Sequence, residues 1–426
     1  MASDDRVVRE VRVGERHDTR ELLRNARRQA RERGLDDLLI VDVDAHHYET
    51  ESWAEIGQYI EDPVIRRQND AGGVMALTGQ SAALLPSQIG NQDVSGRVTR
   101  YRLRKLEEWR DDGEQRDSVL VRRAMDMLGI DYQILFPTPM LNLGLHPVPE
   151  IEVAVARAYA RWMGERVLAH EPRIKTMLYL PFSDPEASLR IVEDFADTPG
   201  VVGFMVTSAR YRPVHHNDYV PLYRAIQERG MPLGFHAGYT WQGDRSMESL
   251  NRFISVHALG FTTHNMVHMT NWLINGMPER FPGLDVIWIE SGLAWLPFLM
   301  QRLDHEYAMR TSEAPLLRRP PSHYMREMYY TSQPLERSNL EALELTFRMI
   351  DAEHRLMYSS DYPHWDFDVP SRIYDLPFLD DHARHNILGE TARRLFGLPA
   401  VPVGGPAGGP HGTAEHEPDT TEVEPR

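Results

Sequence analysis

Apolar runs of about seven to nine residues recur along most of the chain, and each is bounded by polar residues. They lack the strict alternation of polar and apolar positions that marks a half-exposed strand. They therefore predict strands of a parallel sheet that is covered on both faces. The eight expected strands span residues 38–46, 132–138, 174–182, 201–208, 232–238, 285–292, 327–333 and 356–363.

Helical patterns separate these strands, because apolar residues return every three or four positions between them. Eight strands, with a helix after each one from the second onward, predict a (β/α)8 TIM barrel. A doubly wound open sheet is the rival fold. It would bring a glycine-rich phosphate turn after the first strand, and none is present there. The expected helices span residues 151–172, 184–197, 219–230, 264–281, 293–309, 340–353 and 381–397.

The barrel is expected to occupy residues 37–398 of the 426-residue chain, with different material at each end. Residues 1–36 read as an N-terminal arm with one basic helix. Residues 50–118 form a long insertion after the first strand, which would lie on the catalytic face as a lid. Residues 399–426 are rich in Pro, Gly and acidic residues, and this composition predicts a disordered tail.

Composition and charge narrow the class of partner and of site. The formal net charge is −16, so a nucleic-acid partner is not expected. No apolar run reaches membrane-spanning length and no signal core opens the chain, which makes the cytoplasm the default location. The basic arm and acidic tail suit a homodimer or a higher homo-oligomer. The chain has no cysteine, so any metal must be held by histidine and carboxylate side chains.

Polar side chains stand where several expected strands end, and barrel enzymes build their sites at these ends. The first strand carries Asp44 and His46, which share one face because side chains alternate along a strand. His47 then points outward, toward the helices. His236 ends the fifth strand and Asp361 ends the eighth. Two carboxylates and two imidazoles make a plausible ligand set for a divalent metal ion.

The motifs "VDVDAHHYE", "FPTPM", "VVGFMV", "PLGFHAG", "NGMPERFPGLDVIWIESGLAWLP" and "SSDYPHWD" occur in this order between residues 38 and 398. Together they resemble the amidohydrolase superfamily, in particular the branch that includes aminocarboxymuconate-semialdehyde and resorcylate decarboxylases. The resemblance implies that Asp44 and His46 are the metal pair of the first strand. It also implies that His236 and Asp361 are the ligands of the fifth and eighth strands.

The sixth strand departs from this pattern. Decarboxylases of the branch have a histidine there as the acid–base group, whereas this chain has Glu290. A carboxylate can act as a base or as a further metal ligand. The fourth strand has no lysine, so a carbamylated lysine bridging two metals is not available.

The histidine pair His264 and His268 raises an alternative to a single metal ion, namely a site with two ions. The two residues are four apart, on one face of the helix expected after the fifth strand, where they would open that helix. They would either contact a partner chain or join Glu290 and Glu49 around a second metal. The latter pattern resembles the few superfamily members that activate oxygen with two irons.

Three functions follow from these features. The first is hydrolysis or non-oxidative decarboxylation of a small, carboxylate-bearing molecule at one divalent ion (Zn, Mn or Fe), with Glu290 or Asp361 moving the proton. The second is hydroxylation at a di-iron or mixed-metal centre, and the third is a non-catalytic barrel subunit of a complex.

His364 would orient the site, touch substrate or belong to a plain loop. The sequence assigns no role to His47, His215, His216 or His257, and it does not rank Arg97, Arg100, Arg102 and Arg252 as partners for a substrate carboxylate.

Overall fold

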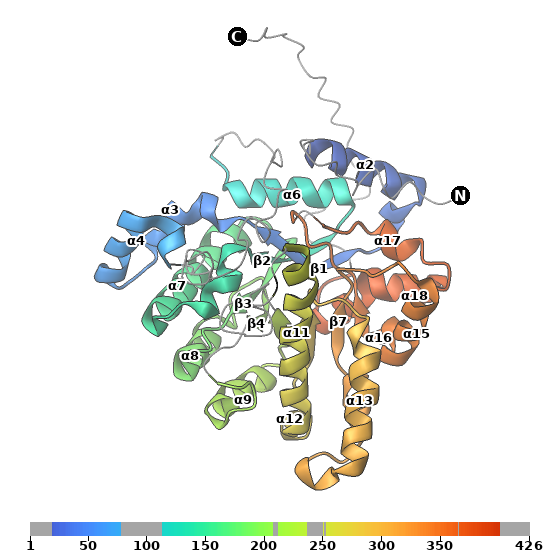
Figure 1. Ribbon diagram of the computed structural model, residues 1–426. Coiled ribbons are helices and arrows are strands. Elements are labelled where there is room, and N and C mark those ends of the chain that lie inside the picture. Colours follow the sequence, from blue (N-terminus) through green and yellow to red (C-terminus); the bar gives the residue numbers. More distant parts are fainter. Residues whose placement is uncertain are drawn as a thin grey trace.

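The computed structural model (Figure 1) forms a parallel barrel surrounded by helices. It describes residues 19–77, 113–207, 212–236, 250, 253–364 and 366–400. The outer part of the expected arm, residues 78–112 of the expected lid and almost all of the expected tail therefore lie outside the described residues. So do Arg97, Arg100, Arg102 and Arg252.

Eight strands run in parallel and follow one another around the barrel in sequence order. Each falls within or next to a range expected from the apolar runs, so the TIM-barrel prediction is confirmed. The strands are β1 (Val41–His47), β2 (Tyr132–Pro137), β3 (Ile174–Tyr179), β4 (Val201–Val206), β5 (Leu233–His236), β6 (Val286–Ile289), β7 (Tyr329–Thr331) and β8 (Leu356–Met357).

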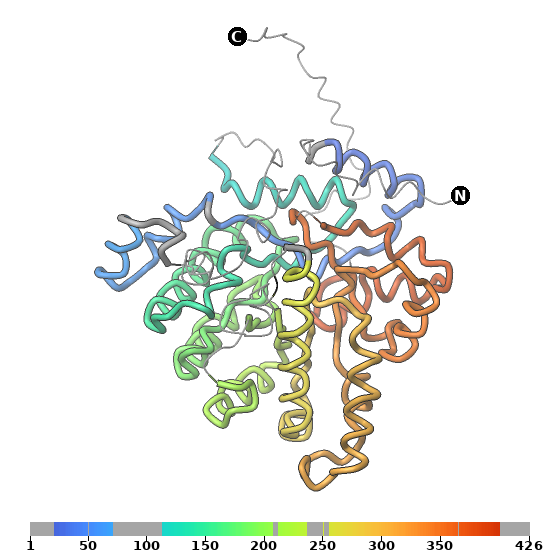
Figure 2. Tube along the Cα trace, viewed as in Figure 1, coloured from blue at the N-terminus to red at the C-terminus, as the bar shows by residue number. Residues whose placement is uncertain are grey.

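Backbone hydrogen bonds between the first strand and the segment at the end of the last strand close the barrel. The Val43 N–H donates to the Tyr358 carbonyl oxygen at 3.0 Å, and the Asp361 N–H donates to the Asp44 carbonyl oxygen at 2.7 Å. Figure 2 shows the blue start of the described chain beside its orange-red end. Two segments more than 300 residues apart in sequence are thus fixed against each other at the site.

The interior of the barrel is filled by side chains and is not a pore. A Cβ atom on Gly203 would lie 2.9 Å from Met177 Cε, and one on Gly234 would lie 2.8 Å from Ile289 Cδ1. Glycine at these two positions lets the larger side chains of neighbouring strands occupy the axis. Only the carboxyl end of the barrel is left to build a site.

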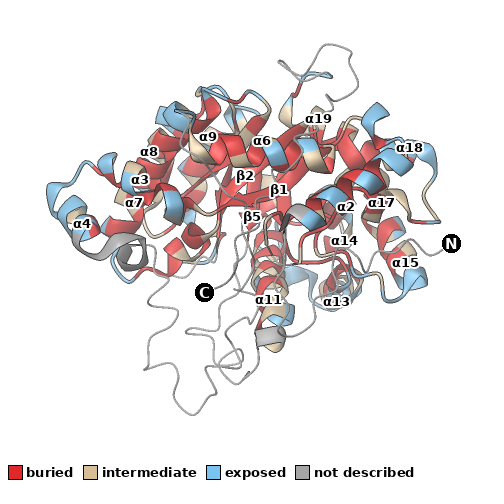
Figure 3. Cartoon of the chain, turned by 90° about the horizontal axis from the view of Figure 1, so that it is seen from above, coloured by how far each residue is buried: buried red, intermediate tan, exposed pale blue. Residues whose placement is uncertain are grey.

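Helices cover the outside of the barrel, with buried inner faces and exposed outer faces (Figure 3). Local signals set several of their starts: Asp184 accepts a hydrogen bond from the Ala187 N–H and Pro185 takes the first helical position of the helix that follows β3. The helices that cover the barrel are α6 (Arg116–Leu128), α7 (Pro149–Trp162), α8 (Pro185–Phe195), α9 (Val220–Glu228), α11 (Phe253–Ile274), α12 (Met277–Arg280), α13 (Trp295–Met309), α14 (Pro321–Met325), α15 (Leu340–Ile350), α16 (Ala352–Arg355), α17 (Ser371–Tyr374), α18 (Asp381–His385) and α19 (Thr391–Phe396).

The segments around β1 add three further helices. The expected basic helix is α2 (Thr19–Glu32), whose Leu23 and Ala26 are buried and which packs on α6. The described part of the insertion after β1 contains α3 (Trp53–Gln58) and α4 (Pro63–Leu77), which pack on α7.

The helix after β5 differs from the expectation. It was expected to begin at His264, but α11 already begins at Phe253, so His264 and His268 lie in its interior and do not open it. His257 lies in the first turns of this helix. No helix in the described ranges is both long enough and apolar enough to cross a membrane.

Candidate metal centre

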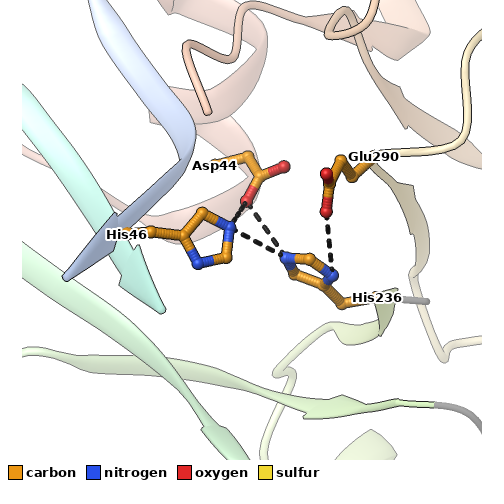
Figure 4. Close-up of side chains that lie close together, drawn as sticks. All are labelled: Asp44, His46, His236 and Glu290. Carbon is orange, nitrogen blue, oxygen red and sulfur yellow. Dashed lines mark hydrogen bonds and ion pairs between the residues drawn. The ribbon is translucent and has the colours of Figure 1, made fainter. Parts of the chain in front are cut away.

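Three side chains at the carboxyl end of the barrel converge on one point (Figure 4). Asp44 Oδ1 lies 3.2 Å from His46 Nε2 and 3.3 Å from His236 Nε2, and the two Nε2 atoms lie 3.3 Å apart. All three side chains are buried. Alternation along β1 brings Asp44 and His46 to the interior face, as expected.

Asp361 approaches the same imidazole from the segment after β8. Its Oδ1 lies 3.3 Å from His46 Nε2 and 2.7 Å from His364 Nδ1. The His364 ring also stacks on the His46 ring, with 4.3 Å between the centroids. The structure therefore brings together all four ligands expected from the sequence and places His364 against one of them.

Glu290 faces the cluster from the end of β6. Its Oε2 lies 3.7 Å from His236 Nδ1. Its carboxylate, together with Asp44, His46 and His236, offers ligand atoms that all lie within 4.8 Å of one another. Glu290 thus stands where a further ligand or a proton-transfer group would stand.

The backbone at Asp361 and Glu290 adopts a conformation that non-glycine residues rarely use. The φ angles are 59° at Asp361 and 50° at Glu290. Left-handed backbone at a non-glycine residue costs about 1 kcal/mol or more, and it is typical of functional sites. Neighbouring contacts hold both turns: the Glu290 N–H donates to Thr331 Oγ1, and the His364 N–H donates to the Asp361 carbonyl oxygen.

Several carboxylate oxygens of the cluster lack a hydrogen-bond donor within the described part of the chain. These atoms are Asp44 Oδ1 and Oδ2, Glu290 Oε2 and Asp361 Oδ2, and each is buried. Leaving a buried carboxylate oxygen without a donor is costly unless a cation compensates it. The donor set of carboxylate oxygens and imidazole nitrogens without sulfur therefore fits a divalent cation.

The pKa shifts of the ionisable side chains in the cluster also favour binding of a divalent cation. Burial, followed by the charge of His364, lowers the pKa of His46 to about 3, so its imidazole is neutral and able to coordinate. Burial, then the carboxylates Asp361 and Asp44, raise the pKa of Glu290 well above its usual range. The pKa of Asp361 is likewise raised well above its usual range, first by burial and then by the charges of Asp366 and Asp44. A bound cation would offset this repulsion between carboxylates.

Hydrogen bonds behind the cluster orient its members. The Pro137 carbonyl oxygen lies 3.1 Å from His46 Nδ1, which leaves Nε2 as the coordinating nitrogen. Asp42 lies deeper in the barrel than Asp44 on the same strand. It accepts hydrogen bonds from the Ser360 N–H at 2.8 Å and from Gln133 Nε2 at 2.9 Å.

Two polar residues of the first motif point away from the cluster. His47 Nδ1 lies 3.1 Å from Asp117 Oδ1 on α6, and Nε2 lies 2.8 Å from the Tyr159 hydroxyl on α7. The expected outward direction of His47 is confirmed. Glu49 accepts hydrogen bonds from the N–H groups of Thr138 and Met140 with its two carboxylate oxygens. It is not brought to the cluster as the second-metal hypothesis requires.

The helix pair His264 and His268 is likewise not brought to the cluster. His268 is buried behind β5, and its ring lies 5.9 Å from that of Phe235, which faces the helices. The described residues contain two groups of three or more metal-capable side chains, and neither includes His264 or His268. The residue of α11 that supports the site is Asn265, whose Nδ2 donates to the carbonyl oxygens of Phe235 and Ile289.

Three other histidines belong to neither metal-capable group of the described residues. His257 Nε2 lies 3.8 Å from Asp366 Oδ2. His215 and His216 lie on the segment before α9, where His216 is exposed and its Nδ1 accepts a hydrogen bond from the Asp218 N–H.

Two residues beside the site, Thr138 and Arg116, were not predicted from the sequence. Thr138 directly follows β2, and its Oγ1 lies 3.1 Å from His364 Nε2. The strand-end rule that selected His236 would have found it. Arg116, at the start of α6, lines a small cavity of about 60 Å³ with His46, Tyr48 and Tyr362. Its position depends on how the insertion returns to the barrel, and no local pattern reveals that.

Solved structures with the same fold come from several bacteria. The 5-carboxyvanillate decarboxylase of Sphingomonas paucimobilis is 20% identical, with a TM-score of 0.59 over 85% of this chain and 100% of that one. An amidohydrolase of Mycobacterium avium subsp. paratuberculosis is 19% identical, with a TM-score of 0.66 over 85% and 99%. A dihydroxybenzoic acid decarboxylase of Polaromonas, solved with manganese and 2-nitroresorcinol, is 19% identical, with a TM-score of 0.60 over 84% and 97%. At this identity the likeness establishes the fold.

The family is established by a different comparison. No curated protein sequence matches the chain. The family model described as amidohydrolase matches residues 41–398, which span the whole barrel and every member of the cluster. The chain belongs to the amidohydrolase family.

Proposed function

We propose that the protein is a metal-dependent decarboxylase of small carboxylate-bearing molecules, with one divalent cation held by Asp44, His46, His236 and Asp361. The observation that carries this proposal is a buried set of carboxylate oxygens that accept no hydrogen bond from the described residues and that face two imidazole nitrogens. The bound cation would polarise and orient the carboxylate of the substrate. Manganese in the Polaromonas structure and decarboxylation in the names of two structural neighbours support this choice.

Glu290 is the proton donor in this proposal. Loss of CO2 breaks the bond between the carboxylate carbon and its neighbouring carbon, and the electron pair that remains on that neighbour takes up a proton. Burial and the nearby carboxylates raise the pKa of Glu290, which favours the protonated carboxyl group that a proton donor requires. A carboxylic acid held neutral in this way can protonate carbon directly. It fills the role that a histidine plays at this strand end in related decarboxylases.

Arg116 is the proposed contact for an anionic or phenolic group of the substrate. It lines the cavity beside His46. Its Nη1 lies 3.6 Å from Oδ1 of Asp117, the next residue in the first turn of α6. A planar guanidinium binds a carboxylate through two parallel hydrogen bonds. Tyr48 and Tyr362 line the same cavity and would flank an aromatic ring.

The test is release of CO2 from a panel of hydroxybenzoates by protein reconstituted with Mn²⁺. We expect activity that chelation abolishes and Mn²⁺ restores. Glu290→Gln should keep metal binding but lose about 100-fold or more in kcat, in the range of an acid–base residue. Retention of both metal content and activity in His236→Ala would overturn the proposal.

A second candidate function is oxygen-dependent hydroxylation at two irons, and Glu290 is the feature that favours it. A third carboxylate beside Asp44 and Asp361 gives the site more negative charge than one divalent ion balances. The oxygenase requires two irons per chain and oxygen consumption coupled to product. One metal per chain and equal activity under anaerobic conditions would exclude it.

A further inference from the structure

Thr138 occupies the position that normally caps a helix, but its hydroxyl does not act as a cap. It is the N-cap residue of the short 3-10 helix η6 (Pro139–Leu145), and its side chain makes no capping hydrogen bond. A threonine in this position usually accepts a hydrogen bond from a backbone N–H of the first turn. The hydroxyl of Thr138 instead lies 3.1 Å from His364 Nε2.

The Glu49 carboxylate caps the start of η6 in place of the Thr138 side chain. Its Oε2 accepts the Thr138 N–H at 2.9 Å, and its Oε1 accepts the Met140 N–H at 2.7 Å. The backbone donors at the start of η6 are thus bonded by a side chain from η2 (Glu49–Ser52), the short 3-10 helix after β1. The Thr138 hydroxyl is therefore available for a contact across the mouth of the barrel.

His364 links the Thr138 hydroxyl to the cluster, because one ring nitrogen contacts Thr138 and the other contacts Asp361. Its Nδ1 lies 2.7 Å from Asp361 Oδ1, so Nδ1 carries the proton that the carboxylate accepts. Nε2 accepts a hydrogen bond from the Thr138 hydroxyl when the imidazole is neutral and donates one to it when the imidazole is charged, so the contact persists in both states. The ring is fixed at both nitrogens and on one face, where it stacks on His46.

We propose that Thr138 is a positioning residue of the metal centre, which holds His364 against Asp361 and thereby fixes the direction of the Asp361 carboxylate. This inference rests on the proposed role of Asp361 as a metal ligand. Without the hydroxyl the His364 ring can rotate about its side-chain bond, and Asp361 then loses the hydrogen bond that orients it. Partners that orient metal ligands typically change metal affinity by about 10- to 100-fold.

The test is the affinity of the metal-free full-length chain for Mn²⁺, measured by calorimetry, with thermal unfolding of the same samples. We expect Thr138→Val, which keeps the shape of the side chain but lacks the hydroxyl, to weaken Mn²⁺ binding about tenfold with little change in Tm. Thr138→Ser should restore affinity to within about twofold, because the serine hydroxyl reaches the same ring. Thr346→Val is the matched control, since the Thr346 hydroxyl bonds the Ala342 carbonyl oxygen on the outer helix α15.

A double-mutant cycle separates positioning from general damage. In a His364→Ala background, Thr138→Val should weaken Mn²⁺ binding no further, because the partner through which it acts is absent. Equal weakening with and without His364, or wild-type affinity in Thr138→Val, would overturn the inference. If Thr138→Val does not fold, Thr138→Ala is held to the same outcomes.

Asp44→Asn distinguishes failure of this inference from failure of the proposed function. Loss of Mn²⁺ binding in Asp44→Asn together with wild-type affinity in Thr138→Val would reject only the positioning role. Undiminished Mn²⁺ binding in Asp44→Asn would reject the metal centre and the positioning role with it.

Discussion

Binding of a divalent cation should raise the thermal stability of the protein, because it supplies the partner that the buried carboxylates of the cluster lack. Asp44, Glu290 and Asp361 bring three carboxyl groups into a buried site, and four of their oxygens accept no hydrogen bond from the described residues. In the metal-free protein this arrangement opposes folding, since burial and mutual repulsion penalise the charged forms. A cation binds the folded chain and not the unfolded one, so folding and binding are linked.

The size of the effect follows from mass action and from the length of the barrel. At a free Mn²⁺ concentration 100 times the dissociation constant, binding stabilises the folded state by about 2.7 kcal/mol. The matched region of about 360 residues unfolds with an entropy of about 0.8 kcal/mol per kelvin, from about 2.1 cal/mol/K per residue. The expected increase in Tm is therefore about 3 to 4 °C, and it should grow with the logarithm of the Mn²⁺ concentration.

The assay is differential scanning calorimetry of metal-free protein over a series of Mn²⁺ concentrations. Asp44→Asn is the control. It removes one negative charge and leaves His46 and His236 in place, so its Tm should respond little to Mn²⁺. An unchanged Tm in the wild-type protein, or an equal increase in Asp44→Asn, would refute the electrostatic reasoning.

Three further predictions concern other parts of the molecule. Burial raises the pKa of Glu152, which accepts a hydrogen bond from the Tyr179 hydroxyl, to about 7. Its contribution to the stability of the folded state is therefore present below pH 4.5 and is lost as the pH rises to 7. Glu152→Gln should remove this pH dependence and stabilise the protein at pH 8 by up to about 3 kcal/mol, and urea unfolding at pH 5 and pH 8 measures the difference. Arg116→Ala should raise the KM for a carboxylate-bearing substrate about tenfold or more with little change in kcat, and steady-state kinetics that show the opposite pattern would exclude Arg116 as an anchor. His268→Leu removes a buried nitrogen, Nε2, that has no hydrogen-bond partner among the described residues, so metal content should stay unchanged and Tm should not fall; loss of a metal ion in elemental analysis would show that His268 is a ligand after all.

The strands and the main ligands were predictable because their signals are local. An apolar run such as 134–137 in β2 fits a strand buried on both faces, and alternation along β1 then places Asp44 and His46 on one face. The rule that sites form at the carboxyl ends of barrel strands placed His236 and Asp361 beside Asp44 and His46. These are distant in sequence, and the structure brings them together.

Glu49, His264 and His268 belong to neither metal-capable group of the described residues, and the sequence carries no signal for the direction of their side chains. The helix that contains His264 and His268 has apolar residues on all sides, so its start at Phe253 had no periodic or capping signal to mark it. Its early start places His268 behind β5. Glu49 lies just beyond the end of β1, where alternation no longer predicts side-chain direction, and it turns to the backbone of η6.

Anomalous diffraction from crystals of the protein grown with Mn²⁺ tests the central claim most directly. A single peak at bonding distance from the Nε2 atoms of His46 and His236 and from the carboxylates of Asp44 and Asp361 is the predicted result, with Glu290 adjacent. A peak elsewhere in the molecule, or none at saturating Mn²⁺, would contradict the assignment of these four residues as a metal centre.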